Sequence, residues 1–218
     1  MSAEAVVTAK RKSPWTVTRV ALAGAAVVLV VAMALDTKVV SIGSEEDVRA
    51  KVFSPETFGA EQFPSIQTKV EERAVDAQTL AAAIAEDRKA AAGKYGTPAG
   101  AGAVLPVRFT GVAGEAKAGI YTVAVEGVPE EIKVRVQTGP AINGTDLRDF
   151  PGTIAFGDFK NQIEYQNAGA GINNAMKKQV LADVDTGNLT GKTITVTGVF
   201  KLINPKNWLV TPVRLSVE

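Results

Sequence analysis

The apolar run from Val20 to Leu35 constrains this chain more than any other feature. It contains no charged residue, and Asp36 closes it. A helix without a polar face is not an ordinary surface helix of a soluble protein. Basic residues before such a segment and none within it predict a cytoplasmic N-terminus, with everything after Asp36 exported. The basic residues here are Lys10, Arg11, Lys12 and Arg19.

Two interpretations of the run are open, a membrane anchor and a cleaved signal peptide. About 20 apolar residues span a bilayer, whereas about 7 to 15 form a signal core. Ala32-Met33-Ala34 fits the small-x-small pattern for cleavage after Ala34. The uncharged residues from Trp15 to Thr18 lengthen the span and favour an anchor. We predict a basic cytoplasmic tail over 1–19 and a membrane anchor or signal peptide over 20–40.

Two residue types are missing from the sequence, cysteine and histidine. Without cysteine there is no disulfide and no site for a bacterial lipid anchor. Without histidine, Ser-His-Asp and Cys-His catalysis and His-ligated zinc are excluded. A formal charge of +1 and only 6% aromatic residues argue against a nucleic-acid partner. We therefore predict a protein without catalytic residues, cofactor or metal.

After the apolar run, residues 41–95 are predicted to form a helical region. Ser54-Pro55-Glu56 marks a helix start, with its proline at the first helical position. Asp76 is a candidate cap for a second helical segment, and the glycines and Pro98 between 93 and 102 predict a loose linker. One apolar stripe recurs at three- and four-residue steps: Ile66, Val70, Ala74, Ala77, Leu80 and Ile84.

After Ala103 the apolar period changes from helical to two, which predicts strands. In the first strand the inward positions are expected to be Leu105, Val107, Phe109 and Val112. A helix over 161–185 follows the third strand, and Gly169 and Gly171 weaken its first half. The five expected strands are 104–114, 120–125, 132–136, 193–200 and 209–217.

Three strands, one helix and two strands form the β-β-β-α-β-β order of an OB-fold, a small five-stranded barrel. The alternative is an open α+β sheet with the same elements. The first strand is long, and Gly111 and Gly114 permit the bend that a barrel needs. We therefore predict an α+β protein with an OB-fold-like barrel over 96–218.

The densest polar stretch lies between Gly139 and Tyr165. One interpretation is structural: Asp146 and Arg148 anchor the loop, and Asp158 or Asn161 caps the following helix. A second is a ligand site for a sugar or a similar polar molecule. A third is acid–base chemistry by the Asp158 and Glu164 carboxylates. The candidate ligand-binding residues are Thr145, Asp146, Arg148, Asp149, Asp158, Asn161, Gln162, Glu164 and Tyr165.

The sequence from Ala34 onward resembles a family of bacterial exported proteins labelled predicted periplasmic lipoproteins. The resemblance rests on Ala34 to Val40, Gly144 to Asp149, Phe156 to Tyr165, Gly198 to Phe200 and Pro212-Val213. It implies a periplasmic location at the bacterial inner membrane, and genes that often lie beside those of sugar ABC transporters. The chain departs from the lipoprotein label because it has no cysteine to acylate.

Our leading hypothesis is a membrane-anchored periplasmic accessory or binding protein that does not catalyse a reaction. The N-terminal run then acts as a single-pass anchor, with cleavage near Ala34 as the alternative. From the resemblance, its partners would be ABC transporter components or a periplasmic binding protein. A second hypothesis is a carbohydrate-active enzyme that uses the carboxylates between 146 and 164. A third is an oligonucleotide-binding OB module, against which charge and aromatic content argue.

Overall fold

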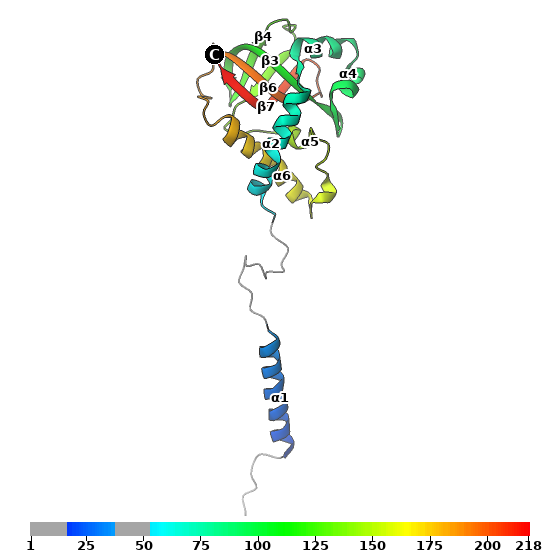
Figure 1. Ribbon diagram of the computed structural model, residues 1–218, viewed down its shortest axis with the longest axis vertical. Helices are drawn as coiled ribbons and strands as arrows, with labels where there is room; N and C mark the ends of the chain where they lie inside the picture. The colour runs from blue at the N-terminus through cyan, green and yellow to red at the C-terminus, as the bar shows by residue number, and fades with distance from the viewer. Residues whose placement is uncertain (1–16, 38–52) are drawn as a thin grey trace, which may run out of the picture. The chain divides into compact units, whose positions relative to one another are not determined.

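The computed structural model describes residues 17–37 and 53–218, and the chain divides into two compact units after Val52. In the first unit, helix α1 (Val17–Asp36) confirms the predicted apolar helix (Figure 1). Its 20 residues extend about 30 Å, enough to cross a bilayer, and no part of the span Arg19–Asp36 is buried. A signal sequence has the same properties. The basic tail through Lys12 and residues 41–52 of the predicted helical region lie outside the described residues.

The second unit begins with three helices, α2 (Pro55–Arg73), α3 (Ala77–Glu86) and α4 (Arg88–Tyr95). Ser54 caps α2 as predicted, because its hydroxyl accepts the Thr57 N–H at 3.3 Å. The stripe residues Ile66, Val70, Leu80 and Ile84 are buried. Helix α2 runs through Pro64, so the proline does not interrupt it.

Two local predictions in this helical part are wrong. Asp76 does not cap α3 with its side chain; its carboxylate instead accepts two hydrogen bonds from Arg108, at 2.8 and 3.0 Å. It lies in β1 (Val75–Asp76), a two-residue strand that only tertiary pairing makes regular. The expected loose linker contains β2 (Thr97–Ala99), which pairs antiparallel with the strand that follows it.

Five longer strands pair side by side into a closed ring, in the order β3-β4-β5-β7-β6 and back to β3. The pairing of β5 with β7 is parallel and the other four pairings are antiparallel. Along the chain, three of these strands precede the helix at Gln162–Val180 and two follow it, which is the predicted order of elements. The members of the ring are β3 (Gly102–Lys117), β4 (Ile120–Val125), β5 (Lys133–Gln137), β6 (Thr193–Lys201) and β7 (Asn207–Val217).

The long strand β3 bends where glycine is required. A Cβ on Gly111 would lie 2.3 Å from the Ala124 carbonyl oxygen, so only glycine fits beside β4. The register between β3 and β4 shifts between Ala113 and Ala116. Val112 is 47% exposed, which corrects its predicted inward position: the inward residues continue from Phe109 to Gly111 and Ala113 at period two.

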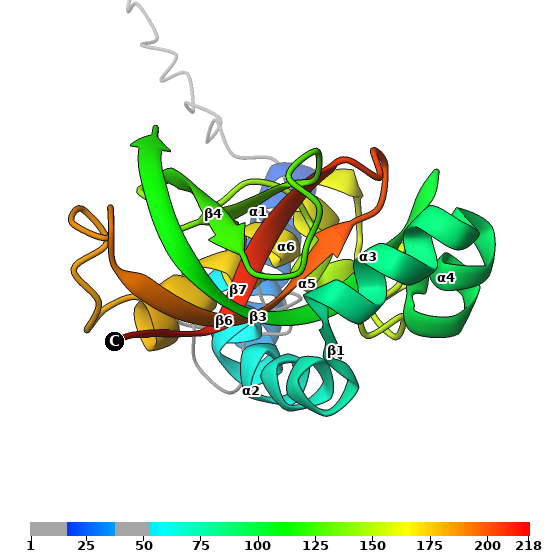
Figure 2. The ribbon, with the colours of Figure 1, turned by 90° about the horizontal axis from the view of Figure 1, so that it is seen from above.

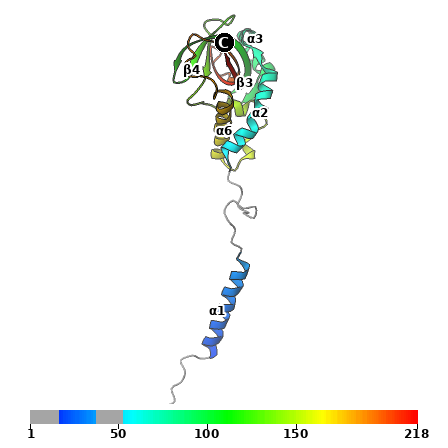
Figure 3. The ribbon, with the colours of Figure 1, turned by 60° about the vertical axis from the view of Figure 1, so that its left-hand side comes forward.

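Helix α6 (Gln162–Val180) connects β5 to β6 and packs against α2, as Figures 1 and 3 show. Before it lie a short helix, α5 (Asp146–Asp149), and a 3-10 turn, η1 (Phe156–Asp158). Where α2 and α6 cross, a Cβ on Gly59 would lie 2.1 Å from the Gly171 oxygen, and one on Gly171 2.0 Å from the Pro55 oxygen. Gly171 therefore permits close helix packing, where the sequence suggested a weakened helix.

One hydrophobic cluster joins α2, α3 and α4 to the ring and to α6. Seen from above, α3 and α4 lie beside the ring, beyond β1 (Figure 2). Inside, Phe200 and Trp208 stack with ring centroids 4.7 Å apart, and the Trp208 Nε1–H donates to the Pro205 oxygen at 2.9 Å. Residues 53–218 thus fold around a shared core.

The close crossing of α2 and α6 predicts the effect of enlarging Gly171. We expect Gly171→Ala to lower the free energy of unfolding by about 3 kcal/mol, because the new methyl group meets rigid backbone at Pro55. Urea unfolding followed by circular dichroism measures this loss.

Gly93→Ala is the matched control, because Gly93 lies in α4 with nothing within 4 Å of its would-be Cβ. We expect this variant to gain about 0.5–1 kcal/mol, since alanine loses less backbone entropy in a helix. Equal stability of both variants and wild type would contradict the proposed role of Gly171.

Candidate functional site

Four of the predicted site residues meet at one hollow of about 460 Å³. It lies where α5, the start of α6, the end of β6 and the β2–β3 turn converge. The sequence separates these parts by up to a hundred positions, and the ring brings them together. The lining residues are Pro98, Ala99, Gly100, Thr145, Arg148, Asp149, Gly152, Ile154, Tyr165 and Lys201.

A buried ion pair forms the wall of this hollow. The Arg148 Nε–H and Nη2–H donate to one oxygen of Asp149, at 2.9 and 2.8 Å, and only 8% of the Arg148 side chain is exposed. The other Asp149 oxygen accepts the Thr145 hydroxyl at 2.8 Å and lies 3.8 Å from the Lys201 ammonium nitrogen. Both Asp149 oxygens therefore have partners within the protein, and this carboxylate positions Thr145, Arg148 and Lys201.

Arg148 also ties α5 to α6. Its Nη1–H donates to the Tyr165 carbonyl at 2.9 Å, and its guanidinium carbon lies 3.6 Å from the centroid of the Tyr165 ring. The structural interpretation of Arg148 as a loop anchor is therefore confirmed. The same contacts fix the face of Tyr165 against the wall of the hollow.

Two residues that line the hollow carry donors that are available for a ligand. The Lys201 ammonium has three N–H donors and one distant partner, Asp149, and its side chain is 25% exposed. Within the described part of the chain, the Tyr165 hydroxyl makes no hydrogen bond. Pro98, Ala99 and Gly100 of the β2–β3 turn also line the hollow. The arrangement suits a small polar molecule that accepts hydrogen bonds.

Asp146 lies next to this group but not in the hollow. Burial raises the pKa of its carboxyl from the ordinary 3.8 to about 6; the Lys201 ammonium opposes this shift, and the Asp149 carboxylate adds to it. The backbone N–H of Lys201 donates to the Asp146 carboxylate. Protonation of Asp146 near pH 6 therefore leaves the cluster with an additional positive charge, from Arg148 and Lys201 against Asp149.

The remaining predicted residues lie at the start of α6, outside the hollow. Asn161 caps α6, since its Oδ1 accepts the Glu164 N–H at 2.9 Å, which confirms the capping prediction for this residue. Asp158 accepts the Ala155 N–H at 2.9 Å, and Glu164 accepts the Lys160 N–H at 3.0 Å. Gln162 is exposed in the first turn. These side chains stabilise local turns and do not converge with Asp149.

Lys201 and the β2–β3 turn were not among the predicted site residues. Lys201 extends the predicted strand 193–200 by one residue, and its partner Val104 lies in β3. The signal in the sequence was a single lysine that follows a strand of Thr, Val and Phe and precedes the turn at Asn204. Nothing local connects it to Thr145, because ring closure makes that contact.

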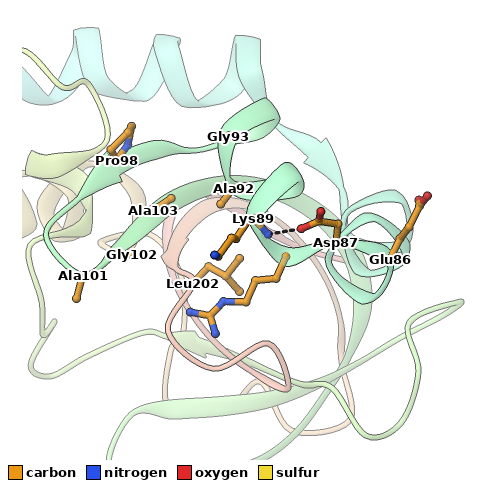
Figure 4. Close-up of a pocket in the computed structure, with 11 residues that line it drawn as sticks. Glu86, Asp87, Lys89, Ala92, Gly93, Pro98, Ala101, Gly102, Ala103 and Leu202 are labelled. Atoms are coloured by element: carbon orange, nitrogen blue, oxygen red, sulfur yellow. Dashed lines mark hydrogen bonds between the residues drawn. The ribbon is translucent and has the colours of Figure 1, made fainter.

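A second, larger hollow of about 800 Å³ adjoins the first and shares Pro98 with it. Figure 4 shows Leu202 close to Lys89 of α4 at this place. Asp87 in this hollow caps α4, because its Oδ1 accepts hydrogen bonds from the N–H groups of Lys89 and Ala90 at 2.8 and 3.0 Å. None of the predicted site residues lines this hollow.

The raised pKa of Asp146 predicts a pH dependence of stability. The folded chain holds this proton more tightly than the unfolded chain, so ionisation of Asp146 costs stability as pH rises from about 4 to about 6. The free energy of unfolding of the wild type should fall by up to about 3 kcal/mol between about pH 4 and about pH 6, and Asp146→Asn should abolish this fall. Urea unfolding at several pH values measures the difference between variant and wild type.

Asp87→Asn serves as the control. The Ala90 and Lys89 N–H groups lower the pKa of Asp87, so this carboxylate affects stability only below about pH 4. The Asp87 variant should keep the wild-type slope between pH 4 and 6. The same slope in Asp146→Asn would show that Asp146 does not cause it.

A solved structure shares the fold of this chain. It is an OB-fold protein from Thermotoga maritima, with a TM-score of 0.60 and 19% sequence identity, and the match covers 77% of this chain and 100% of the other. At this identity the likeness shows the fold alone. It supports the α+β prediction with an OB-fold relative.

The family is shown by the sequence itself. No curated protein is significantly similar to this chain. The family described as "Predicted periplasmic lipoprotein (DUF2291)" matches residues 25–216, which include most of α1 and all but the last two residues of the second unit. The chain contains no cysteine, the residue that lipid acylation of a bacterial lipoprotein modifies. Because the match covers most of its length, the chain belongs to this family of predicted periplasmic lipoproteins.

Proposed function

We propose that this protein is a membrane-tethered periplasmic binding protein that does not catalyse a reaction. In this proposal α1 is retained as a single-pass anchor in the bacterial inner membrane, and residues 53–218 form an OB-type barrel outside it. The ligand is a small polar molecule, and a sugar fits the transport context that the family resemblance implies. ABC transporter components or a periplasmic binding protein are the proposed partners.

The observation that carries the proposal is the pair of available donors in the first hollow. Lys201 and Tyr165 present an ammonium and a hydroxyl beside a wall that the Arg148–Asp149 pair holds rigid. A preorganised wall lowers the entropy that a ligand loses on binding. Asp149, Asp158 and Glu164 each accept a hydrogen bond from the protein, which supports a structural role for these carboxylates.

The tether is supported by α1 and by the missing cysteine. A chain of this family that cannot be acylated needs another means of staying at the membrane, and α1 is long enough to provide it. The alternative is that α1 is removed as a signal peptide, because Ala32-Met33-Ala34 matches the pattern for cleavage after Ala34.

Retention of α1 predicts the mass and location of the mature protein. We expect the full-length chain in carbonate-washed membranes, with an intact mass that includes α1. The measurement is mass spectrometry of the membrane and soluble periplasmic fractions. A soluble protein that begins at Leu35 would overturn the tether and leave the ligand site untouched.

The available donors predict that binding depends on Lys201 and Tyr165. Titration calorimetry of the full chain against a panel of mono- and disaccharides, with inorganic phosphate as a non-sugar probe, is the test. We expect a sugar to bind, and Lys201→Gln and Tyr165→Phe each to weaken it. The loss for Lys201 should be about 10-fold or more, because a hydrogen bond to a charged group contributes about 1.5–3 kcal/mol.

Lys206→Gln is the matched control, because Lys206 is an exposed lysine in the adjoining β6–β7 loop and does not line the hollow. It should bind like wild type. Binding of phosphate alone would change the ligand class to anions. No binding from the panel, or equal affinity of all three variants, would refute this site.

A further inference from the structure

Aromatic side chains gather at one end of the second unit. The rings of Phe53, Phe58 and Phe159 lie with centroids 5.5–5.6 Å apart, and Phe159 lies 5.4 Å from Tyr165. Phe156 extends the group at 5.7 Å from Tyr165, edge to face. These rings come from the start of α2, from η1 and its neighbour, and from the first turn of α6. We call this group, together with Ile163, the aromatic face.

The aromatic face is partly open to solvent. Phe156 is 51% exposed and Ile163 is 68% exposed, while Phe53, Phe58 and Phe159 are half-buried. The half-buried rings hold each other in edge-to-face contact, so the exposed side chains project from a rigid base. Exposed apolar side chains that adjoin a cluster of aromatic rings form a candidate contact surface.

The place of the aromatic face in the chain indicates what covers it. Phe53 is both the first residue of the second unit and a member of the face. Only residues 38–52 separate it from the end of the α1 segment, and these can span at most about 55 Å. Figure 1 shows the start of α2 and the segment before α6 at the same end of this unit. A bilayer that holds α1 is therefore within reach of Phe156 and Ile163.

We propose that the aromatic face rests on the periplasmic surface of the membrane that holds α1, with Phe156 and Ile163 in the lipid interface. This inference depends on the tether proposed above. Aromatic side chains prefer the bilayer interface, and a tether raises the effective concentration of the surface, so a small apolar contact suffices.

The charges around the face indicate which lipid property matters. Lys160 is exposed beside it, but Asp158 and Glu164 lie in the same segment and offset that charge. Insertion is therefore driven by apolar burial and does not need anionic lipid. It should persist in neutral phosphatidylcholine and at high salt, which screens exposed charges.

A fluorescent label can report the insertion directly. The chain has no cysteine, so Gly157→Cys gives a single labelling site next to Phe156, and nothing lies within 4 Å of the new Cβ. Full-length protein carrying an NBD label at this position is reconstituted in phosphatidylcholine vesicles that contain brominated phosphatidylcholine. We expect a blue shift of the NBD emission and quenching by bromine.

Gly187→Cys is the matched control. Gly187 is exposed in the loop after α6, whose 19 residues extend about 28 Å, whereas the aromatic face lies at the start of α6. A label there should show neither the shift nor the quenching. Phe156→Ser with Ile163→Ser should abolish both signals at position 157 without unfolding the chain, because both side chains are exposed.

Flotation of the vesicles separates this inference from the tether. Protein that does not float with the vesicles lacks the tether itself. Protein that floats while the label at 157 behaves like the label at 187 refutes the docking alone. A blue shift without bromine quenching means that protein, such as a second copy of the chain, covers the face, and this also overturns the proposal. Quenching that survives the double serine variant refutes the roles of Phe156 and Ile163.

Discussion

The pairing of β3 with its neighbours is the interaction on which the second unit depends. This strand pairs with β4 and β6 to close the ring, and also with β1 and β2, which attach the helices α3 and α4. Its nine-residue register with β6 places Lys201 opposite Val104, beside the β2–β3 turn. The core, the helical flank and the candidate site therefore all depend on the position of one strand.

Periodicity in the sequence was sufficient to predict the elements that bury one face. The ring strands and α6 were found within a few residues, because alternating or helical burial marks each of them. The strands β1 and β2 were missed, since two or three residues carry no period and become regular only by pairing with β3. Gly171 was misread for a similar reason: a helical glycine lowers propensity, and only the partner helix explains it.

The candidate site was predictable only where its residues are close in sequence. Arg148 and Asp149 lie on one short helix and Thr145 directly precedes it, so the polar density of the loop indicated them. Lys201 lies more than fifty residues away and enters by ring closure. Asp158 and its neighbours were among the candidate ligand-binding residues because helix caps and ligand sites use the same polar residue types. Backbone hydrogen bonds distinguish the two uses, and these appear only in the structure.

The ring also has a consequence for the order of folding. Its closure joins residues 104–112 of β3 to 193–201 of β6, and β7 must then fit between β5 and β6. These contacts link distant parts of the chain, which makes folding slow compared with that of helical proteins of similar size. The ring cannot close until almost the whole chain is available. If the chain is exported from its N-terminus as proposed, the second unit therefore stays open during transfer and gains its core last.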